Sequence, residues 1–222
     1  MAVVPLLFCF AGTAAAAQKT AVASEGLVSA TLSYQQGSDS FGNATFSNLQ
    51  LTIERSGVSY YTQPVSSPSC GTSCLVEQAP SGGALAVRDL EGNGQPDVVL
   101  DLYTGGAHCC SVVQVFAFDP GVGTYRLSEH NFGDPGARLS DLSGDGPLEF
   151  QSADDRFAYE FAPYAYSGLP IRIWCFSGGH FIDVTREFPQ PIALDAKRQW
   201  HEFLSNRRAG LALGFIAAWA AD

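Results

Sequence analysis

The sequence contains little positive charge and few charged residues of any kind. Asp, Glu, Lys and Arg make up 15% of its 222 residues, and 12 basic against 22 acidic side chains leave a net charge of -10. A chain with this balance offers no basic face to neutralise phosphates, which argues against nucleic-acid binding. The motifs Gly-x-Ser-x-Gly and His-Glu-x-x-His, the Walker phosphate loop and the dinucleotide fingerprint are also missing. No recognisable enzyme signature remains.

The sequence also lacks an apolar run long enough to span a bilayer as a helix. Its N-terminus has a shorter apolar run, from Val3 to Gly12, followed by Ala15-Ala16-Ala17. This order is typical of a secretory signal peptide with an A-x-A cleavage site, so we expect residues 1–17 to be a signal and the protein to be secreted or periplasmic. No Lys or Arg precedes the run. The alternative is a buried N-terminal strand.

The composition favours a folded, strand-rich chain. It is 46% hydrophobic and 12% aromatic, with 23 Gly and 12 Pro, so apolar material for a core is interrupted by many turns. Short alternating or apolar runs recur about every 10 residues. We expect strands at 27–35, 49–53, 58–60, 85–87, 98–103, 112–118, 125–129, 149–150, 157–161, 171–176 and 181–184. These predict an antiparallel β-meander or sandwich-like domain over residues 18–190.

The pattern changes to helical spacing after Pro191. Ala196, Trp200 and Phe203 fall on one face, and Arg207-Arg208 suit the end of a helix dipole. A second apolar stretch, Leu211 to Ala221, is too short to span a membrane and is expected to pack as a helix on the β domain. Residues 191–222 are therefore expected to form a C-terminal helical segment, which makes the fold class mainly β (α+β).

Two acidic loops of the same pattern lie 52 residues apart. Residues 89–97 (DLEGNGQPD) and 141–149 (DLSGDGPLE) both read D-L-x-G-[ND]-G-x-x-[DE] and run into apolar residues. Alternating oxygen donors on a short loop suit calcium, which takes six to eight oxygen ligands in a flexible shell. The sequence therefore predicts two calcium loops. In each, the carboxylate at position 9 closes the site and position 7 offers a backbone carbonyl.

Three further kinds of loop share features with this pattern. An EF-hand needs a bidentate glutamate at position 12, where this chain has Leu100 and Ser152, and a dockerin-type loop fails for the same reason. A plain turn without any ion is also compatible with the residues, since Asp, Asn and Gly satisfy turn geometry. A second copy in the same frame favours the calcium interpretation over the plain turn.

The loops resemble the calcium loop of FG-GAP and VCBS-type repeats, which occur in integrin α-subunit propellers and in many secreted bacterial proteins. Phe132-Gly133 stands upstream of the second loop, as the Phe-Gly pair does in such repeats, and residues 97–100 resemble the strand after the loop. Residues 154–189 also resemble uncharacterised bacterial secreted proteins that carry such loops. The resemblance implies the ligands Asp89, Glu91, Asn93, Gln95, Asp97, Asp141, Ser143, Asp145, Pro147 and Glu149. A propeller needs several four-stranded blades, so two motifs favour a smaller, non-propeller β domain.

Five cysteines remain if Cys9 leaves with the signal, and an exported chain meets oxidising conditions in which disulfides form. The disulfide candidates are Cys70, Cys74, Cys109 and Cys110. Our preferred pairing links Cys70 and Cys74 to the Cys109-Cys110 pair, which leaves Cys175 as a thiol within a strand. For the stretch around His108, a disulfide-bearing turn is favoured over a metal site or a catalytic thiol, because neighbouring side chains of an extended chain point to opposite faces.

The remaining candidate sites are weaker. Asp154-Asp155-Arg156 would add carboxylates to the second calcium site or form a turn with an ion pair, of which we favour the turn. Trp174, Tyr164 and Tyr166 would line a sugar-binding face or belong to the core and its rim, of which we favour the core and rim for a strand-rich chain.

Taken as a whole, the sequence predicts an exported calcium-binding module with a binding or structural role and an unknown protein or carbohydrate ligand. The alternative is a secreted hydrolase that uses calcium as a structural support. Asp101, Asp183 and Glu187 would then be the candidates for an acid-base pair.

Overall fold

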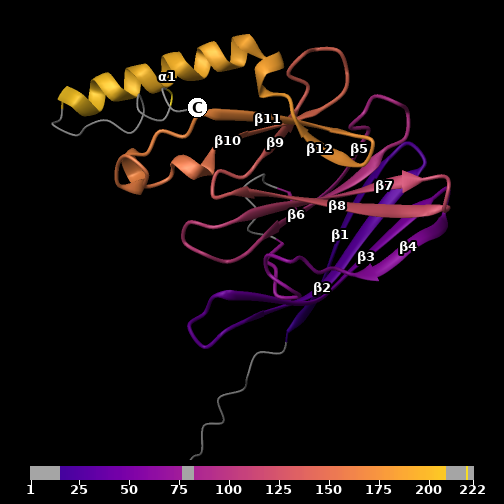
Figure 1. Ribbon diagram of the computed structural model, residues 1–222. Coiled ribbons are helices and arrows are strands. Elements are labelled where there is room, and N and C mark those ends of the chain that lie inside the picture. Colours follow the sequence, from indigo (N-terminus) through magenta and orange to yellow (C-terminus); the bar gives the residue numbers. More distant parts are fainter. Residues whose placement is uncertain (1–15, 77–82, 209–218, 220–222) are drawn as a thin grey trace, which may run out of the picture.

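The computed structural model describes residues 16–76, 83–208 and Trp219. These residues form twelve strands, one α-helix and three short 3₁₀ helices (Figure 1). The strands are β1 Ala17–Glu25, β2 Val28–Ser38, β3 Ala44–Arg55, β4 Val58–Pro64, β5 Leu85–Arg88, β6 Asp97–Tyr103, β7 Ser111–Asp119, β8 Thr124–Gly133, β9 Arg138–Ser140, β10 Glu149–Ala153, β11 Ile171–Ser177 and β12 His180–Asp183. The helices are η1 Asp155–Phe157, η2 Tyr164–Tyr166, η3 Thr185–Glu187 and α1 Pro189–Arg208.

The strands form three four-stranded antiparallel sheets, each built from strands consecutive in the chain. We call them the N-terminal sheet (β1–β4), the middle sheet (β5–β8) and the C-terminal sheet (β9–β12). Tight turns set the register: Ser56-Gly57 closes β3 onto β4 and Gly178-Gly179 closes β11 onto β12, all four residues with positive φ. Such turns match the twist of the strands that they join.

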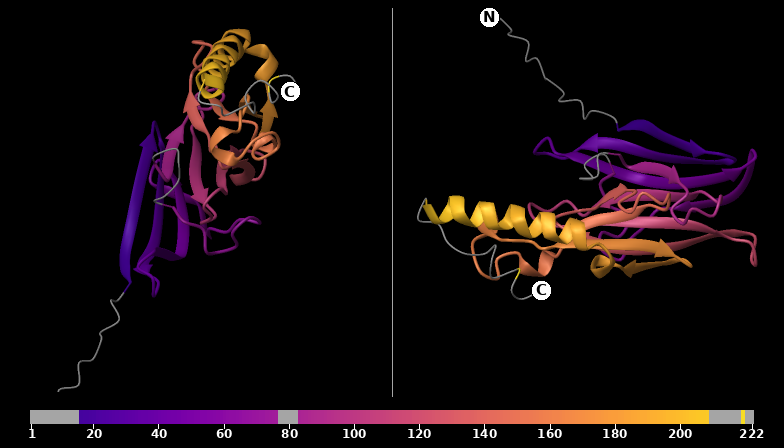
Figure 2. Two further views of the ribbon diagram at one scale, coloured as in Figure 1. Left: turned by 90° about the vertical axis from the view of Figure 1, so that its left-hand side faces the viewer. Right: turned by 90° about the horizontal axis from the view of Figure 1, so that it is seen from above.

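The middle sheet is buried on both faces, because the other two sheets pack against it from opposite sides. Side chains alternate along β6, so Val98, Leu100 and Leu102 join one core while Val99 joins the other. The first core fills the space between the N-terminal and middle sheets, and the second lies between the middle and C-terminal sheets. Figure 2 shows the resulting succession of layers.

Helix α1 covers the C-terminal sheet on the side away from the middle sheet (Figures 1 and 2). Two of its side chains bind the backbone that leads into β11: Gln199 Nε2 donates to Leu169 O at 2.9 Å, and Asp195 Oδ2 accepts from Ile171 N at 3.1 Å. The helices of the described residues include none that is long and apolar enough to cross a membrane.

The mainly antiparallel β fold with a C-terminal helix confirms the fold class expected from the sequence. The described residues form three four-stranded sheets. Two strands were missed, the nine-residue β1 and the three-residue β9. The strand expected at 157–161 is wrong: η1 and a turn with Tyr159 at φ +63° lie there instead. Most of the expected signal peptide and of the expected second helix lies outside the described residues.

Candidate functional site

The two acidic loops occupy equivalent places in the fold. Loop 1 (residues 89–97) joins the first and second strands of the middle sheet, and loop 2 (residues 141–149) joins the first and second strands of the C-terminal sheet. The 52-residue repeat in the sequence is therefore a repeat of the four-stranded unit.

The glycines of both loops lie in the left-handed region of the backbone. The glycines at positions 4 and 6 all have positive φ: 67° at Gly92, 77° at Gly94, 79° at Gly144 and 108° at Gly146. Residues with a Cβ rarely adopt these angles, so the glycines of the motif are required by the turn itself.

The aspartate at position 1 closes each loop by accepting backbone N–H groups. In loop 1, Asp89 Oδ1 accepts from Asn93 N at 3.1 Å and Oδ2 accepts from Gly94 N at 2.7 Å. In loop 2, Asp141 Oδ1 accepts from Gly144 N at 2.6 Å and Oδ2 accepts from Gly146 N at 3.1 Å. The hydrogen bond from the backbone N–H of position 6 to the aspartate at position 1 therefore occurs in both loops.

The oxygen donors at positions 1, 3 and 5 of loop 2 converge. Ser143 Oγ lies 2.5 Å from Asp145 Oδ1 and 3.4 Å from Asp141 Oδ1. A cavity of about 440 Å³ adjoins them, lined also by Glu149, Cys175 and Glu187. It gives solutes access to the side chains of loop 2.

The carboxylate at position 9 is buried in both loops, with 3% of Asp97 and 6% of Glu149 exposed. Each accepts the backbone N–H of position 2: Leu90 N donates to Asp97, and Leu142 N donates to Glu149 Oε2 at 2.8 Å. Burial raises the pKa of Glu149, and the charges of Asp141 and Asp145 raise it further.

The carboxylate of Asp97 is less fully hydrogen-bonded than that of Glu149. Its Oδ2 is buried and has no hydrogen-bond partner in the described part of the chain. Burial, together with the charges of Glu91 and Asp89, raises the pKa of Asp97 to about 7. A buried carboxylate oxygen without a partner costs free energy, and a cation beside it would offset that cost.

The loops also contact each other. Leu148 N donates to Leu90 O at 3.1 Å, and a Cβ added at Gly92 would lie 3.1 Å from Pro147 Cγ. Glu91 Oε1 accepts from Gly178 N at 2.7 Å, in the turn between β11 and β12. Loop 1 thus packs on the C-terminal sheet as well as ending its own strand.

The two loops offer the kind of oxygen ligands that a hard cation prefers, but their acidic side chains are not gathered around a single point. Among the described residues, no group of three or more His, Cys, Asp and Glu side chains is placed to hold a metal ion. Glu91 binds Gly178 and Asn93, and the side chain of Gln95 accepts from Arg55 Nη2 at 2.5 Å, so neither side chain points solely into loop 1. The observation in favour of a cation is the unpartnered oxygen of Asp97 within a set of oxygen donors.

The four disulfide candidates are all in disulfides, but our preferred pairing is wrong. Cys70 bonds to Cys74, and Cys109 bonds to its neighbour Cys110. The local pairing follows from a tight turn in which Ser67 and Gly71 exchange backbone hydrogen bonds, which places Cys70 and Cys74 within 5.2 Å Cα to Cα. Cys175 is a free thiol in β11, and burial raises its pKa.

The stretch around His108 is the disulfide-bearing turn that we expected. The His108 ring packs against the Tyr164 ring at a centroid distance of 4.0 Å. The two cysteines beside it are joined to each other, so no thiol is free there to act as a nucleophile or metal ligand.

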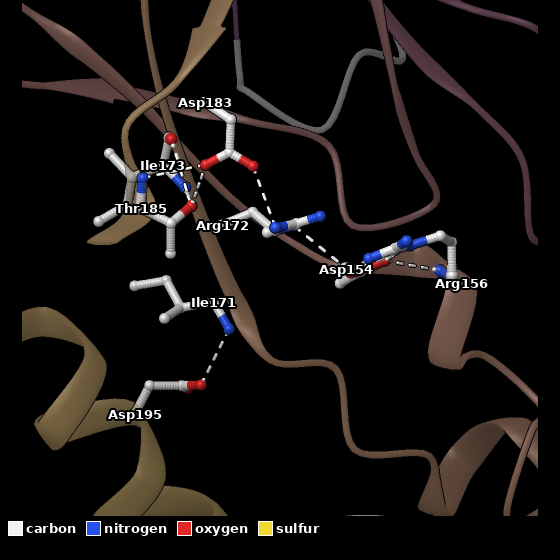
Figure 3. A network of polar contacts seen from close by, with 8 residues as sticks. All are labelled: Asp154, Arg156, Ile171, Arg172, Ile173, Asp183, Thr185 and Asp195. Atoms are coloured by element: carbon white, nitrogen blue, oxygen red, sulfur yellow. Dashed lines mark hydrogen bonds and ion pairs between the residues drawn. The ribbon is translucent and has the colours of Figure 1, made fainter. Parts of the chain in front are cut away.

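A polar network that the sequence did not reveal joins β11 and β12 to η1 (Figure 3). Arg172 Nε lies 3.4 Å from Asp154 Oδ2, and Arg172 Nη1 lies 3.0 Å from Asp183 Oδ2. Arg156 also binds Asp154, which confirms the turn with an ion pair. Burial alone would raise the pKa of Asp154, but the hydrogen bonds from Arg156 and the charge of Arg172 hold it below its ordinary value. Such contacts between distant segments carry no local sequence signal.

Comparisons with known proteins reveal two relatives. No family model matches the chain, and no solved structure matches it. The chain is 36% identical over 157 residues to a protein of Synechocystis described as a probable thylakoid lumen protein, an alignment that covers 62% of this chain and 42% of that protein. It is 34% identical over 90 residues to an uncharacterized protein of Sinorhizobium fredii, covering 40% of this chain and 14% of that protein. The chain therefore spans less than half the length of the relatives it matches.

Proposed function

We propose that the chain is an exported β-rich module with a binding or structural role, stabilised by calcium in loops of the FG-GAP and VCBS type. The observation that carries the calcium proposal is Asp97 Oδ2, a buried carboxylate oxygen without a hydrogen-bond partner among the described residues. The positive φ at positions 4 and 6 and the hydrogen bond from position 6 to position 1, common to both loops, support two sites of one kind.

The residues that would hold calcium in loop 1 are Asp89, Asn93 and Asp97, with the backbone carbonyl of Gln95. In loop 2 they would be Asp141, Ser143, Asp145 and Glu149, with the carbonyl of Pro147. When bound, calcium supplies positive charge that neutralises the clustered carboxylates. Because both loops join sheets and contact each other, neutralising them would stabilise the fold.

Three observations support an exported location. The N-terminus has the composition of a signal peptide. The two disulfides are of a kind that persists in oxidising compartments. The relative from Synechocystis is described as a lumen protein.

The test compares thermal unfolding and calorimetric calcium titration in the wild type, Asp97→Asn and Glu160→Gln. Glu160 is exposed and outside both loops, so its variant is the matched control for the loss of one negative charge. We expect calcium at a hundredfold excess over its dissociation constant to stabilise the wild type and the control by about 3 kcal/mol per site.

The Asp97→Asn variant should behave in opposite ways with and without the ion. In chelator it should be more stable than the wild type, since the unpartnered buried charge is gone, whereas in calcium it should have lost one binding site. An unchanged wild-type melting temperature after calcium removal, together with no heat of binding, would rule out the calcium role.

A further inference from the structure

A cavity of about 330 Å³ lies between the edge of the middle sheet and the C-terminal sheet, and no residue of either acidic loop lines it. Residues of β8, β11 and the segment around η1 form its walls. Its volume is at the lower end of the range for small-molecule sites. Its residues are independent of the proposed calcium loops.

One wall of this cavity is aromatic. The rings of His130, Phe132 and Trp174 are in mutual contact, with centroid distances of 4.5 Å from His130 to Phe132, 5.2 Å from His130 to Trp174 and 5.1 Å from Phe132 to Trp174. Burial lowers the pKa of His130, although the charge of Asp183 opposes this. The three ring planes are inclined to one another by 50° to 90°, so this wall presents ring faces and ring edges to the cavity.

The polar part of the lining adjoins the rings, because Arg172 and Trp174 are two residues apart on β11 and share one face of that strand. Asp154 is fixed between Arg156 and Arg172 (Figure 3), and Asp155 follows it in the chain. Asp155 Oδ1 is buried and lacks a hydrogen-bond partner in the described residues. This second unpartnered carboxylate oxygen is explained if a ligand supplies the missing donor.

The formal charges around the cavity cancel. Its lining includes the carboxylates of Asp154 and Asp155 and the guanidinium groups of Arg156 and Arg172. A strongly charged ligand would therefore find as much repulsion as attraction. A neutral ligand with both donors and acceptors of hydrogen bonds, and with an apolar face for the rings, matches all the walls.

We propose that this cavity binds one ring of a neutral saccharide, with the sugar face against Trp174 and a hydroxyl group donating to Asp155. Sugar rings combine a C–H face, which packs on aromatic rings, with hydroxyl groups that pair with fixed carboxylates and guanidinium groups. The lining of the cavity contains both kinds of group.

An aromatic rim beside the cavity extends the proposal to a short oligosaccharide. His108 and Tyr164 are in ring contact, and Tyr159, which is 59% exposed, lies 5.3 Å from Tyr164 between centroids. Asp134 connects this rim to the cavity: its backbone N–H donates to Asp155, and its carboxylate lies 4.0 Å from His108 Nδ1. A second sugar ring leaving the cavity would meet these rings.

In the test, the full chain is titrated with maltotriose, cellotriose and triacetylchitotriose. Binding is measured by tryptophan fluorescence and by calorimetry. We expect saturable binding of at least one trisaccharide. Asp155→Asn should weaken it tenfold or more, because a buried hydrogen bond to a charged group is lost. Tyr164→Ala should weaken the trisaccharide more than the corresponding monosaccharide, whereas Tyr60→Ala, an aromatic change on the N-terminal sheet, should leave both unchanged.

Two outcomes would overturn the proposal. These are no saturable response to any of the three probes, or equal affinity of the wild type and a folded Asp155→Asn variant. Because the cavity and the loops share no residue, Asp97→Asn should retain the saccharide affinity. Failure of the calcium proposal and failure of the saccharide proposal are therefore distinguishable.

Discussion

At the residue scale, Asp101 shows how a buried carboxylate makes stability depend on pH. It lies in β6 with 8% of its surface exposed, and burial raises its pKa to about 7 from an ordinary 3.8. Between these values the folded state binds the proton more tightly than the unfolded state does. The contribution of Asp101 to the free energy of unfolding therefore falls as the pH rises from about 4 to 7, and the full cost is present above pH 7.

We accordingly expect Asp101→Asn to be more stable than the wild type at pH 8, by on the order of 3 kcal/mol, and close to it at pH 4. Urea unfolding at the two pH values measures the difference. An equal gain at both pH values would contradict an effect of charge, since the gain would then come from packing.

Gly133 is constrained both by its positive φ and by the nearby Asp155 side chain. Gly123 has a similar φ without such a neighbour and is the control for the backbone angle alone. Gly133 and Gly123 have nearly equal φ, 66° and 68°, but a Cβ at Gly133 would lie 2.7 Å from Asp155 Cβ, whereas a Cβ at Gly123 would meet nothing within 4 Å. We expect Gly123→Ala to cost about 1 kcal/mol for its backbone alone. Gly133→Ala should cost at least about 1 kcal/mol more, because Asp155 must move.

Thermal unfolding of the two alanine variants provides the comparison. The Gly133→Ala variant should also lose saccharide affinity, since Asp155 is displaced from the cavity wall. Equal destabilisation of both variants would show that the backbone angle alone explains the need for glycine at position 133.

At the scale of elements, the Cys70–Cys74 disulfide stabilises the long connection between β4 and β5. The two cysteines are four residues apart, and Cys74 is 1% exposed within the first core. Closing so short a loop removes little entropy from the unfolded chain, and we expect the Cys70→Ala/Cys74→Ala double variant to lose about 2 kcal/mol.

Peptide mapping under non-reducing conditions checks the connectivity directly. We expect one peptide with an internal Cys70–Cys74 bond and another with an internal Cys109–Cys110 bond. A bridged pair of peptides that links Cys74 to Cys109 would instead support the cross-link preferred from the sequence.

The sequence predicted the strands in which apolar and polar residues alternate clearly. It did not predict strands in which this alternation is weak or short. Val28 to Tyr34 alternates large apolar with polar residues, and β2 lies there. Strand β1 places only Ala21 and Ala23 against the core, and β9 is three residues long, so neither gave a periodic signal. Phe157 to Phe161 alternates but does not form a strand, because one alternating residue, Tyr159, has a left-handed backbone.

The sequence also predicted one candidate site better than the other. Loop residues lie together in the chain, so spacing alone predicted two loops of one pattern with a carboxylate at position 9, but not that these carboxylates are buried. The aromatic cavity takes its walls from β8, η1 and β11, and only the pairing of β10 with β11 brings Asp154 next to Arg172. Trp174 was a candidate from the sequence, but the pairing of Asp154 with Arg172 depends on tertiary structure.

At the scale of the whole molecule, the two cores share one sheet. Every residue of β6 from Asp97 to Leu102 is buried, because each face of the middle sheet belongs to a different core. Loop 1 adds hydrogen bonds from the middle sheet to the C-terminal sheet, and Arg55 Nη2 of the N-terminal sheet binds Gln95 in the same loop. Loss of the middle sheet would expose both cores at once, so the three sheets should unfold together.

This cooperativity is testable because all three tryptophans, Trp174, Trp200 and Trp219, follow the middle sheet in the chain. Their fluorescence reports on the C-terminal part, while far-UV circular dichroism reports on every sheet. Leu32→Ala removes a fully buried side chain from the first core, at the N-terminal sheet, and should cost about 2–5 kcal/mol. If the sheets unfold as one unit, the fluorescence and dichroism midpoints fall by the same amount.

Val58→Ala is the control in the same sheet, because Val58 is 58% exposed, and it should change stability by less than about 0.5 kcal/mol. A fluorescence midpoint that stays at the wild-type value while the dichroism midpoint falls would show that the N-terminal sheet unfolds separately. The second core would then be stable without the first, although the two share the strands of the middle sheet. The burial of β6 on both faces argues against that outcome, since a separated middle sheet would expose Val98, Leu100 and Leu102 to water.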